Sequence, residues 1–272
     1  MTKISIIGGT GRIGSAFAEA LKNKGHEVII SSRSTKIKPI DAAKQGDIVI
    51  ISVPIKSTER VIKELAPFTK KEAILTDFTS VKVKPCKLME KYSKSNIIGG
   101  HPLFGPGVNI SGQSIVLCNI RGNKLKELKS IYEFIGLKVI ELSDEQHDKE
   151  MAIIQCMNQF DNLGFANYLF KNKFNLNGKE KFTPNFKIRL SVIGRTLSQS
   201  ADLYPEILME NPYSGEIISN YIKSLKELQK LINDKNEMAL EEKVIELQAY
   251  FGSLVQESKI LTNEILNKME NK

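Results

Sequence analysis

The sequence predicts an α/β fold, with a doubly wound sheet in the first half of the chain and only helices in the second half. Short apolar runs rich in β-branched residues alternate with helical patterns from residue 3 to about residue 142, as in strands joined by crossover helices. From His147 onward, apolar residues recur with helical periodicity and no run has the pattern of a strand. A chain of 272 residues is also long for a single hydrophobic core. We therefore expect one domain over residues 1–145 and a second, all-α domain over residues 146–272.

The composition is that of a globular protein of a reducing compartment. Hydrophobic residues make up 41% of the chain and charged residues 26%. The three cysteines, Cys86, Cys118 and Cys156, are far apart and form no CxxC pair, which argues against a disulfide framework or a zinc site. No signal-peptide pattern precedes the first strand, and no apolar run approaches the roughly 18 residues of a membrane span. We expect a cytoplasmic protein with no metal site and no membrane contact.

The formal net charge of +8 favours an anionic partner. The lysines are spread along the chain among Glu and Asp, and no stripe combines aromatic with basic residues as in nucleic-acid binding. A small anionic molecule is therefore the expected partner, and no nucleic acid is expected.

The first strand leads directly into a glycine-rich turn. The β-branched run at residues 3–7 is followed by GGTGRIG and by a helical stretch from residue 15 to residue 24. Three of these glycines form the GxGxxG pattern that places the diphosphate of a dinucleotide at a helix N-terminus. The strand, turn and helix together indicate a Rossmann-type dinucleotide-binding domain. The residues of the turn that we expect to bind the cofactor are Gly9, Gly11, Arg12, Ile13 and Gly14.

The end of the second strand indicates which dinucleotide binds. This strand covers residues 26–31 and is followed by Ser32, Arg33 and Ser34, where a site for NAD normally has Asp or Glu. A guanidinium between hydroxyl groups suits the 2′-phosphate of NADP, which a carboxylate would repel. NADP is therefore favoured over NAD. The alternative is that Arg33 stacks on the adenine ring and both cofactors bind.

The next segments continue the sheet. Residues 34–46 have the pattern of a short linker. A buried strand at residues 47–54 follows, and we add Ser52 and Pro54 at its end to the cofactor-binding residues. Further strands are predicted at residues 73–77, 113–119 and 137–142, and helices at residues 57–68, 84–92 and 124–135.

Ser80 and His101 are the candidate catalytic residues of this half. Ser80 follows the strand at residues 73–77, at the sheet edge where such folds place ligands. It is a candidate hydrogen-bond donor to His101 or to the nicotinamide, or alternatively the N-cap of the next helix. His101 stands between a pair of glycines and Pro102, directly after an apolar run, so its neighbours aim one imidazole at a strand's end. It is either a base that transfers a proton near neutral pH or a structural loop histidine.

Two rows of polar residues mark the helical half. The first is a stripe on one face of its first long helix, formed by Asp148, Gln155, Gln159 and Asn162. The second lies on the helix that begins at Thr183-Pro184, where every fourth residue is polar: Lys187, Ser191 and Arg195. The first row suggests the wall of a site or an interface. The second suggests either a clamp for a carboxylate or a solvated basic face.

The last helices carry apolar stripes longer than one small domain needs for its own core. One stripe is formed by Ile218, Tyr221, Ile222 and Leu225, and another by Leu240, Val244, Leu247, Phe251, Leu254 and Leu261. We therefore expect helix packing between subunits and a homodimer.

Six segments, taken in order, resemble the prephenate dehydrogenases, the dehydrogenases of tyrosine biosynthesis. They are GGTGRIG, ISVPIKSTERVI, LTDFTSVK, GGHPLFGPG, EQHDKEMAIIQ and TPNFKIRLSVIGR. The similarity runs from about residue 3 to about residue 266, and it is with the dehydrogenase part of bifunctional enterobacterial-type enzymes in particular. The resemblance implies an oxidoreductase of aromatic amino acid biosynthesis.

The resemblance also implies a reaction and roles for three residues. Prephenate would lose hydride from the ring carbon that bears the hydroxyl group and carbon dioxide from the opposite ring position, giving 4-hydroxyphenylpyruvate and reduced NAD(P). The family's HPxFGP histidine matches His101, which would accept a hydrogen bond from that hydroxyl. Its serine before Val-Lys matches Ser80, and its arginine for a substrate carboxylate matches Arg195.

Two departures from the family pattern leave the substrate open. Related enzymes often have a histidine where this chain has Gln159 and an arginine where it has Lys187. Both are expected to bind substrate, but Gln159 carries no charge and Lys187 is a point charge rather than a fork. Prephenate is favoured, with L-arogenate and 4-amino-4-deoxyprephenate as alternatives. More remote alternatives are an NADP-binding sensor without catalysis and a reductase that passes hydride between NADP and a deazaflavin.

Overall fold

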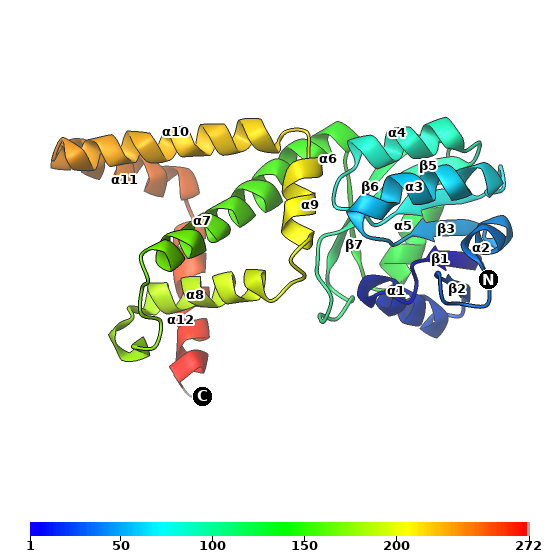
Figure 1. Ribbon diagram of the computed structural model, residues 1–272, viewed down its shortest axis with the longest axis horizontal. Helices are drawn as coiled ribbons and strands as arrows, with labels where there is room; N and C mark the ends of the chain where they lie inside the picture. The colour runs from blue at the N-terminus through cyan, green and yellow to red at the C-terminus, as the bar shows by residue number, and fades with distance from the viewer. Residues whose placement is uncertain (271–272) are drawn as a thin grey trace. The chain divides into compact units, whose positions relative to one another are not determined.

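The computed structural model of the chain describes residues 1–270, and they form two compact units (Figure 1). The first, which we call the sheet unit, contains residues 1–154 and 205–213. The second, which we call the helical unit, contains residues 155–204 and the chain from residue 214 onward.

The sheet unit is built on a seven-stranded sheet in the order β2-β1-β3-β4-β5-β6-β7. The strands are β1 (Lys3–Ile7), β2 (Glu27–Ser31), β3 (Ile48–Ile51), β4 (Ile74–Asp77), β5 (Asn96–Pro102), β6 (Ser114–Arg121) and β7 (Lys138–Glu141). Neighbouring strands are parallel except for β5 and β6, so the sheet is mostly parallel, as predicted. The chain leaves β1 on one side and returns to its other side as β3. The carboxyl ends of β1 and β3 are therefore the switch point at which such sheets bind ligands.

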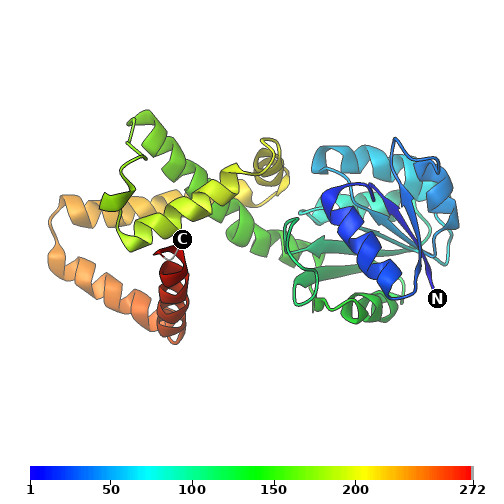
Figure 2. The same ribbon diagram turned by 90° about the horizontal axis from the view of Figure 1, so that it is seen from below.

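Helices cover both faces of this sheet, each closing its own hydrophobic core. One core lies under α1 (Arg12–Asn23) and α5 (Leu125–Phe134), and α1 lies in front of the sheet in Figure 2. The other core lies under α2 (Pro39–Gln45), α3 (Ile55–Leu65) and α4 (Val83–Tyr92). A short 3₁₀ turn, η1 (Ala66–Phe68), extends α3. Successive strand residues alternate between the two cores, as the pleat of a strand requires.

The prediction of a plain linker between β2 and β3 is wrong, because α2 lies there. Pro39 stands in its first turn, where its missing N–H costs nothing and its φ suits a helix. The helix has seven residues and buries only Ala42 and Ala43. Two alanines are too few to produce the apolar stripe by which a helix is found in a sequence.

The sheet unit ends in helical segments that border the site described below. Ser143 and Gln146 form a capping box at the start of α6 (Asp144–Met151), in which each side chain bonds the backbone N–H of the other residue. A π-helical segment, η2 (Ala152–Met157), follows α6. Most of α9 (Leu203–Glu210) also belongs to the sheet unit.

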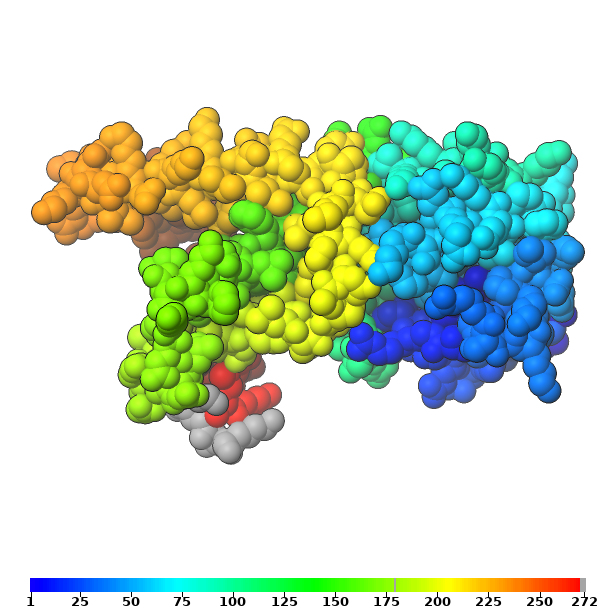
Figure 3. Space-filling model, viewed as in Figure 1, coloured from blue at the N-terminus to red at the C-terminus, as the bar shows by residue number. Residues whose placement is uncertain are grey.

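The helical unit contains no strand among its described residues. Its helices are α7 (Asn158–Lys171), η3 (Lys179–Lys181), α8 (Pro184–Leu197), α10 (Ser214–Asn233), α11 (Glu237–Phe251) and α12 (Leu254–Glu270). Only Ser214 of α10 is buried, and no residue of α11 is buried. Figure 3 shows α10 exposed along its length. No helix of residues 1–270 combines the length and the apolar content that crossing a membrane takes.

Candidate active site

The turn after β1 is so tight that only glycine fits at its key positions. Gly8 has a φ of +84°, and a Cβ atom there would lie 2.1 Å from the backbone oxygen of Ser52. A Cβ atom would lie 2.9 Å from the oxygen of Ile6 if placed on Gly9, and 2.7 Å from the oxygen of Gly8 if placed on Gly14. The turn thereby packs the start of α1 against the ends of β1 and β3. The GxGxxG pattern does not mark Gly8, although its place directly after the strand is a signal for it.

This turn fits the diphosphate of a dinucleotide. α1 begins at Arg12 with Gly11 at its N-cap, which has no side chain to bond the first N–H groups of the helix. No acidic residue lies in the first turn, so the partial positive charge of the helix N-terminus is not offset there. An anion with several acceptor oxygens is the natural partner for such N–H groups, which belong to Arg12, Ile13 and Gly14.

Hydroxyl groups and one guanidinium line the loop after β2. The Ser32 N–H donates to Oγ1 of Thr35 at 2.8 Å, and the Ser34 N–H donates to Oγ of Ser32 at 3.3 Å. Arg33 and Ser34 are exposed. Because β2 pairs with β1, this loop and the glycine turn are neighbours at the carboxyl edge of the strands. A cation and several hydroxyl groups therefore stand next to the place where the diphosphate fits.

Ser52 and Pro54 follow β3 at the switch point. The Ser52 N–H donates to the backbone oxygen of Ile7 at 2.7 Å, which joins the end of β3 to β1. Pro54 is the N-cap residue of α3. The residues predicted to bind the cofactor thus follow three neighbouring strands at one edge of the sheet.

His101 lies within β5 rather than in a loop, and its role as a base stays a prediction. It pairs with Val116 of β6 and is only 2% exposed. The two glycines before it are required by packing. A Cβ atom on Gly99 would lie 2.5 Å from Sγ of Cys86, and one on Gly100 would lie 2.7 Å from the backbone oxygen of Asp77. The strand end is therefore placed correctly to within a few residues, and close packing on both sides sets the direction of the imidazole.

The imidazole of His101 belongs to a buried, hydrogen-bonded chain of three side chains, which we call the histidine chain. Nδ1 of His101 lies 2.8 Å from Nε2 of His147. Nδ1 of His147 lies 2.8 Å from Oδ1 of Asp148. The two imidazole rings meet edge to face, and both His147 and Asp148 are fully buried. His147 is not among the residues predicted from the sequence, although the adjacent His-Asp pair in EQHDKEMAIIQ is a signal for it.

The far end of the histidine chain is held by the backbone between β4 and α4. Oδ1 of Asp148 accepts from the N–H of Lys82 at 2.7 Å, and Oδ2 accepts from the N–H of Val83 at 2.9 Å. The backbone oxygen of Asp148 accepts from Nδ2 of Asn211 at 2.8 Å. The carboxylate therefore has a fixed position and accepts from donors on both oxygens.

Burial lowers the pKa of both histidines. Desolvation is the largest influence on His101, and the neighbouring His147 and Lys82 also lower its pKa, to well below the usual value. Desolvation likewise outweighs the hydrogen bond of Asp148, which by itself would raise the pKa of His147. The lowered pKa of each imidazole favours its neutral form, which is the form that accepts a proton.

A buried ion pair lies directly behind His101. Nζ of Lys82 lies 2.6 Å from each carboxylate oxygen of Asp77, and it also donates to the backbone oxygen of Gly100 at 2.6 Å. Both charged side chains are completely buried. The pair connects the end of β4, the start of α4 and the residue that precedes His101.

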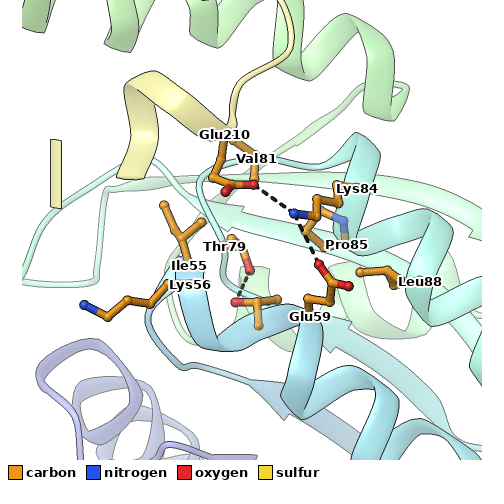
Figure 4. Close-up of a pocket in the computed structure, with 10 residues that line it drawn as sticks. Ile55, Lys56, Glu59, Thr79, Val81, Lys84, Pro85, Leu88 and Glu210 are labelled. Atoms are coloured by element: carbon orange, nitrogen blue, oxygen red, sulfur yellow. Dashed lines mark hydrogen bonds and ion pairs between the residues drawn. The ribbon is translucent and has the colours of Figure 1, made fainter. Parts of the chain in front are cut away.

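A small pocket opens beside this region between α3 and α4 (Figure 4). Lys84 at its rim forms ion pairs with Glu59 at 3.3 Å and Glu210 at 3.0 Å, so its charge is already balanced by two carboxylates. The hydroxyl groups of Thr58 and Thr79 lie 3.4 Å apart in the pocket wall. Ser80 is the next residue after Thr79 and is half-buried. Its hydrogen bond to His101 stays a prediction.

The other predicted site residues lie in the helical unit. Oε1 of Gln159 on α7 accepts from the hydroxyl of Thr196 on α8 at 3.2 Å, so the structure joins Gln159 to the last turn of α8. Arg195 lies in that same turn and is exposed, whereas Lys187 is half-buried near the start of the helix. Eight residues of helix separate Lys187 from Arg195, about 12 Å along the axis. Both residues belong to α8, and their joint binding of a carboxylate stays a prediction.

Two family models match the chain in succession. The model described as "Prephenate dehydrogenase, nucleotide-binding domain" matches residues 32–141, and the one described as "Prephenate dehydrogenase, dimerization domain" matches residues 143–246. Together they cover most of the chain.

Curated proteins named as prephenate or arogenate dehydrogenases are similar to this chain over nearly its whole length. The "Probable arogenate/prephenate dehydrogenase" of Methanocaldococcus jannaschii is 36% identical over 92% of this chain and 61% of its own length. The "Prephenate dehydrogenase [NADP(+)]" of Saccharomyces cerevisiae is 26% identical over 98% of this chain and 66% of its own length. The chain therefore spans less than two thirds of either relative.

A solved structure has the same fold. Prephenate dehydrogenase from A. aeolicus, in complex with hydroxyphenyl propionate and NAD+, superposes with a TM-score of 0.75. The alignment covers 92% of this chain and 97% of that chain at 21% sequence identity. At this identity the likeness shows the fold alone.

Breaking the Lys82–Asp77 pair is expected to destabilise the sheet unit strongly. Replacing Lys82 by Met leaves the Asp77 carboxylate buried without its cation, which should lower the free energy of unfolding by about 3–5 kcal/mol. Lys84→Met is the matched control two residues along the chain, because the Lys84 side chain is 52% exposed and its ion pairs should contribute less than about 1 kcal/mol. Urea denaturation of both variants measures the difference. Equal losses in the two variants would contradict the prediction.

Proposed function

The chain belongs to the prephenate dehydrogenase family, and from this premise we propose that it oxidises and decarboxylates prephenate to 4-hydroxyphenylpyruvate, with hydride transfer to NAD(P), in tyrosine biosynthesis. The observation that carries the proposal is a buried His101, whose pKa is lowered by burial, on a strand whose carboxyl end shares the sheet edge with the glycine turn. A dinucleotide on that turn would have its reactive ring near this edge.

The proposed chemistry needs alignment and one hydrogen bond. The bound NAD(P) supplies the hydride acceptor. His101 accepts a hydrogen bond from the ring hydroxyl, which stabilises the positive charge that develops on that carbon as hydride leaves. Carbon dioxide leaves from the opposite ring position, its bonding electrons complete the aromatic ring, and the reaction becomes strongly downhill. Ser80 is proposed to orient the hydroxyl or His101 from the loop after β4.

Three residues of the helical unit are proposed to bind the rest of the substrate. Arg195 is assigned to one carboxylate, because an exposed guanidinium offers two parallel donors to a planar anion. Lys187 is a candidate for a second anionic group. Gln159 can hydrogen-bond either a keto group or an ammonium group, since its amide both donates and accepts. Prephenate is therefore the first choice of substrate, with L-arogenate and 4-amino-4-deoxyprephenate as the alternatives.

NADP is proposed as the preferred cofactor. Ser32, Arg33 and Ser34 follow β2, where an acidic residue would select NAD. The yeast relative is named for NADP(+), whereas the A. aeolicus structure is a complex with NAD+, so the family name alone does not decide between the two cofactors.

A homodimer is proposed on the apolar faces of the last helices. The exposed side chains of α11 and α12 include Val244, Leu247, Phe251, Leu254 and Leu261. Large apolar side chains that stay exposed on successive helices are typical of protein interfaces. We assign dinucleotide binding to residues 1–145, and substrate binding and dimerisation to residues 146–272.

Turnover with prephenate tests the proposed function. The purified chain should form reduced nicotinamide, followed by its absorbance, with prephenate, arogenate or 4-amino-4-deoxyprephenate, and kcat/KM should be highest for prephenate. His101→Asn should lower kcat by about 10²–10⁴-fold with unchanged cofactor affinity, the usual effect of losing a general base. A chain that binds NADP but turns over none of the three substrates would be a sensor, and the proposal would fail.

Cofactor choice should depend on Arg33. Arg33→Ala should raise KM for NADP+ by about 10- to 150-fold, the loss expected for hydrogen bonds to a charged group, and should leave KM for NAD+ nearly unchanged. Lys24→Ala makes the same change in net charge at the C-terminal end of α1, away from the glycine turn, and serves as the control. An equal effect on both cofactors would place Arg33 outside the 2′-phosphate site.

Substrate affinity should depend on Arg195. Arg195→Gln should weaken substrate binding by about 2–5 kcal/mol if the guanidinium pairs with a desolvated carboxylate, with cofactor affinity unchanged. Steady-state KM values for substrate and cofactor separate the two effects. A parallel fall in cofactor affinity would argue against this role.

A further inference from the structure

We propose that His147 and Asp148 are positioning residues that hold the proton of His101 on Nδ1, so that His101 presents an unprotonated Nε2 to the substrate hydroxyl. The inference rests on the proposed dehydrogenase function for its consequence, but its structural content concerns the histidine chain alone. The hydrogen bonds run from Asp148 through His147 to His101, and each bond fixes the direction of the next.

The first step is the direction of the bonds at Asp148. Its two oxygens accept from the backbone N–H groups of Lys82 and Val83 at 2.7 and 2.9 Å, and a backbone N–H can only donate. These N–H groups stabilise the ionised form of the side chain, and Nδ1 of His147 is a third group in contact with it. The side chain is therefore a carboxylate that accepts on both oxygens.

The second step is the tautomer of His147. Its Nδ1 lies 2.8 Å from Oδ1 of Asp148, so Nδ1 must carry the proton that this contact needs. Because burial lowers the pKa of His147, the ring is neutral and has only one proton. Its Nε2 consequently carries a lone pair.

The third step is the tautomer of His101. Its Nδ1 lies 2.8 Å from Nε2 of His147, and two lone pairs cannot face each other at this distance. Nδ1 of His101 must therefore donate. Since the pKa of His101 is also lowered, this ring is neutral as well, and its Nε2 is unprotonated.

The charged groups around the chain favour these neutral rings. Lys82 lowers the pKa of both rings, whereas its ion-pair partner Asp77 on β4 raises that of His147. Burial raises the pKa of the thiols of Cys86 on α4 and Cys118 on β6, in the second case to about 12, so neither is a thiolate. Asp144 in the first turn of α6 is a more distant negative charge. An imidazolium at His147 would reverse the bond to His101, but it would place a cation near the ammonium of Lys82 in a fully buried site.

The arrangement has a consequence for the reaction. When the substrate hydroxyl donates a hydrogen bond to Nε2 of His101, the imidazole takes up partial positive charge. The carboxylate of Asp148 stabilises this charge through the hydrogen bonds of His147. A third group that fixes the tautomer of a base is the same physical device as the acid in a hydrolase triad. Here a second imidazole stands between the acid and the base.

A direct test is the position of the proton in the unaltered protein. The chain contains three histidines, so ¹⁵N-labelled histidine gives three pairs of side-chain nitrogen signals, and His26→Gln removes one pair for assignment. At pH 7 we expect His101 and His147 each to carry one proton, on Nδ1. A proton on Nε2 of His101 would overturn the proposal. This measurement needs no substrate, so it stands whether or not prephenate is turned over.

A pair of variants tests the effect on catalysis. His147→Phe keeps a ring but removes the acceptor for His101, and it should lower kcat by about 10- to 100-fold, the range for losing the partner that orients a metal-binding histidine. KM for substrate and cofactor should change little. His147→Gln should recover most of kcat, because its amide oxygen can accept from His101 while its NH₂ donates to Asp148.

The outcome that separates positioning from mere packing is the difference between these two variants. Both must first match the parent protein in circular dichroism and in the urea midpoint to within the loss of one hydrogen bond. His26 is a half-buried histidine that does not belong to the histidine chain. His26→Phe is therefore the control and should keep full kcat. Equal kcat in the Phe and Gln variants, or a kcat unchanged by His147→Phe, would overturn the proposed role. Absence of turnover in the parent protein would instead overturn the proposed function.

Discussion

The buried ion pair between Lys82 and Asp77 is the interaction on which the site depends. A lone ammonium or carboxylate in this position would cost several kcal/mol, so the end of β4 and the start of α4 can only fold together. The third partner of the ammonium is the backbone oxygen of Gly100, which ties β5 to the same point. The backbone N–H of Lys82 holds Asp148 on α6. One residue thus fixes both ends of the histidine chain through its side chain and its backbone.

Close packing makes this arrangement rigid. Gly99 and Gly100 allow β5 to approach Cys86 and the end of β4 more closely than any side chain would permit. The imidazole of His101 is therefore placed by a central strand rather than by a loop, and the groups behind it lie on β4, α4 and α6. Sites built on regular elements hold their side chains more precisely than sites built on loops, which is what a reaction controlled by alignment requires.

Local patterns in the sequence predict much of the sheet and of the dinucleotide turn, because strands, glycine turns and crossover helices have short-range signatures. α2 is not predicted, because a helix that buries only Ala42 and Ala43 has no apolar stripe. The hydrogen bond between His101 and His147 is not predicted for another reason: it joins residues 46 positions apart and depends on how α6 packs against the sheet. The resemblance assigns roles to Arg195 and Ser80, which position and spacing had already marked, but no motif states a hydrogen-bond direction.

The second imidazole of the histidine chain resolves a conflict between orienting a base and keeping it neutral. A carboxylate bonded directly to His101 would fix its tautomer, but it would also raise its pKa, and a protonated imidazole accepts nothing. Asp148 has this raising effect on His147, where desolvation outweighs it. At His101, one ring further on, desolvation, His147 and Lys82 all lower the pKa. The interposed His147 passes on the direction of the hydrogen bonds while Asp148 stays one ring away from the base. The histidine chain can therefore present the unprotonated Nε2 of His101 to an anionic substrate at neutral pH.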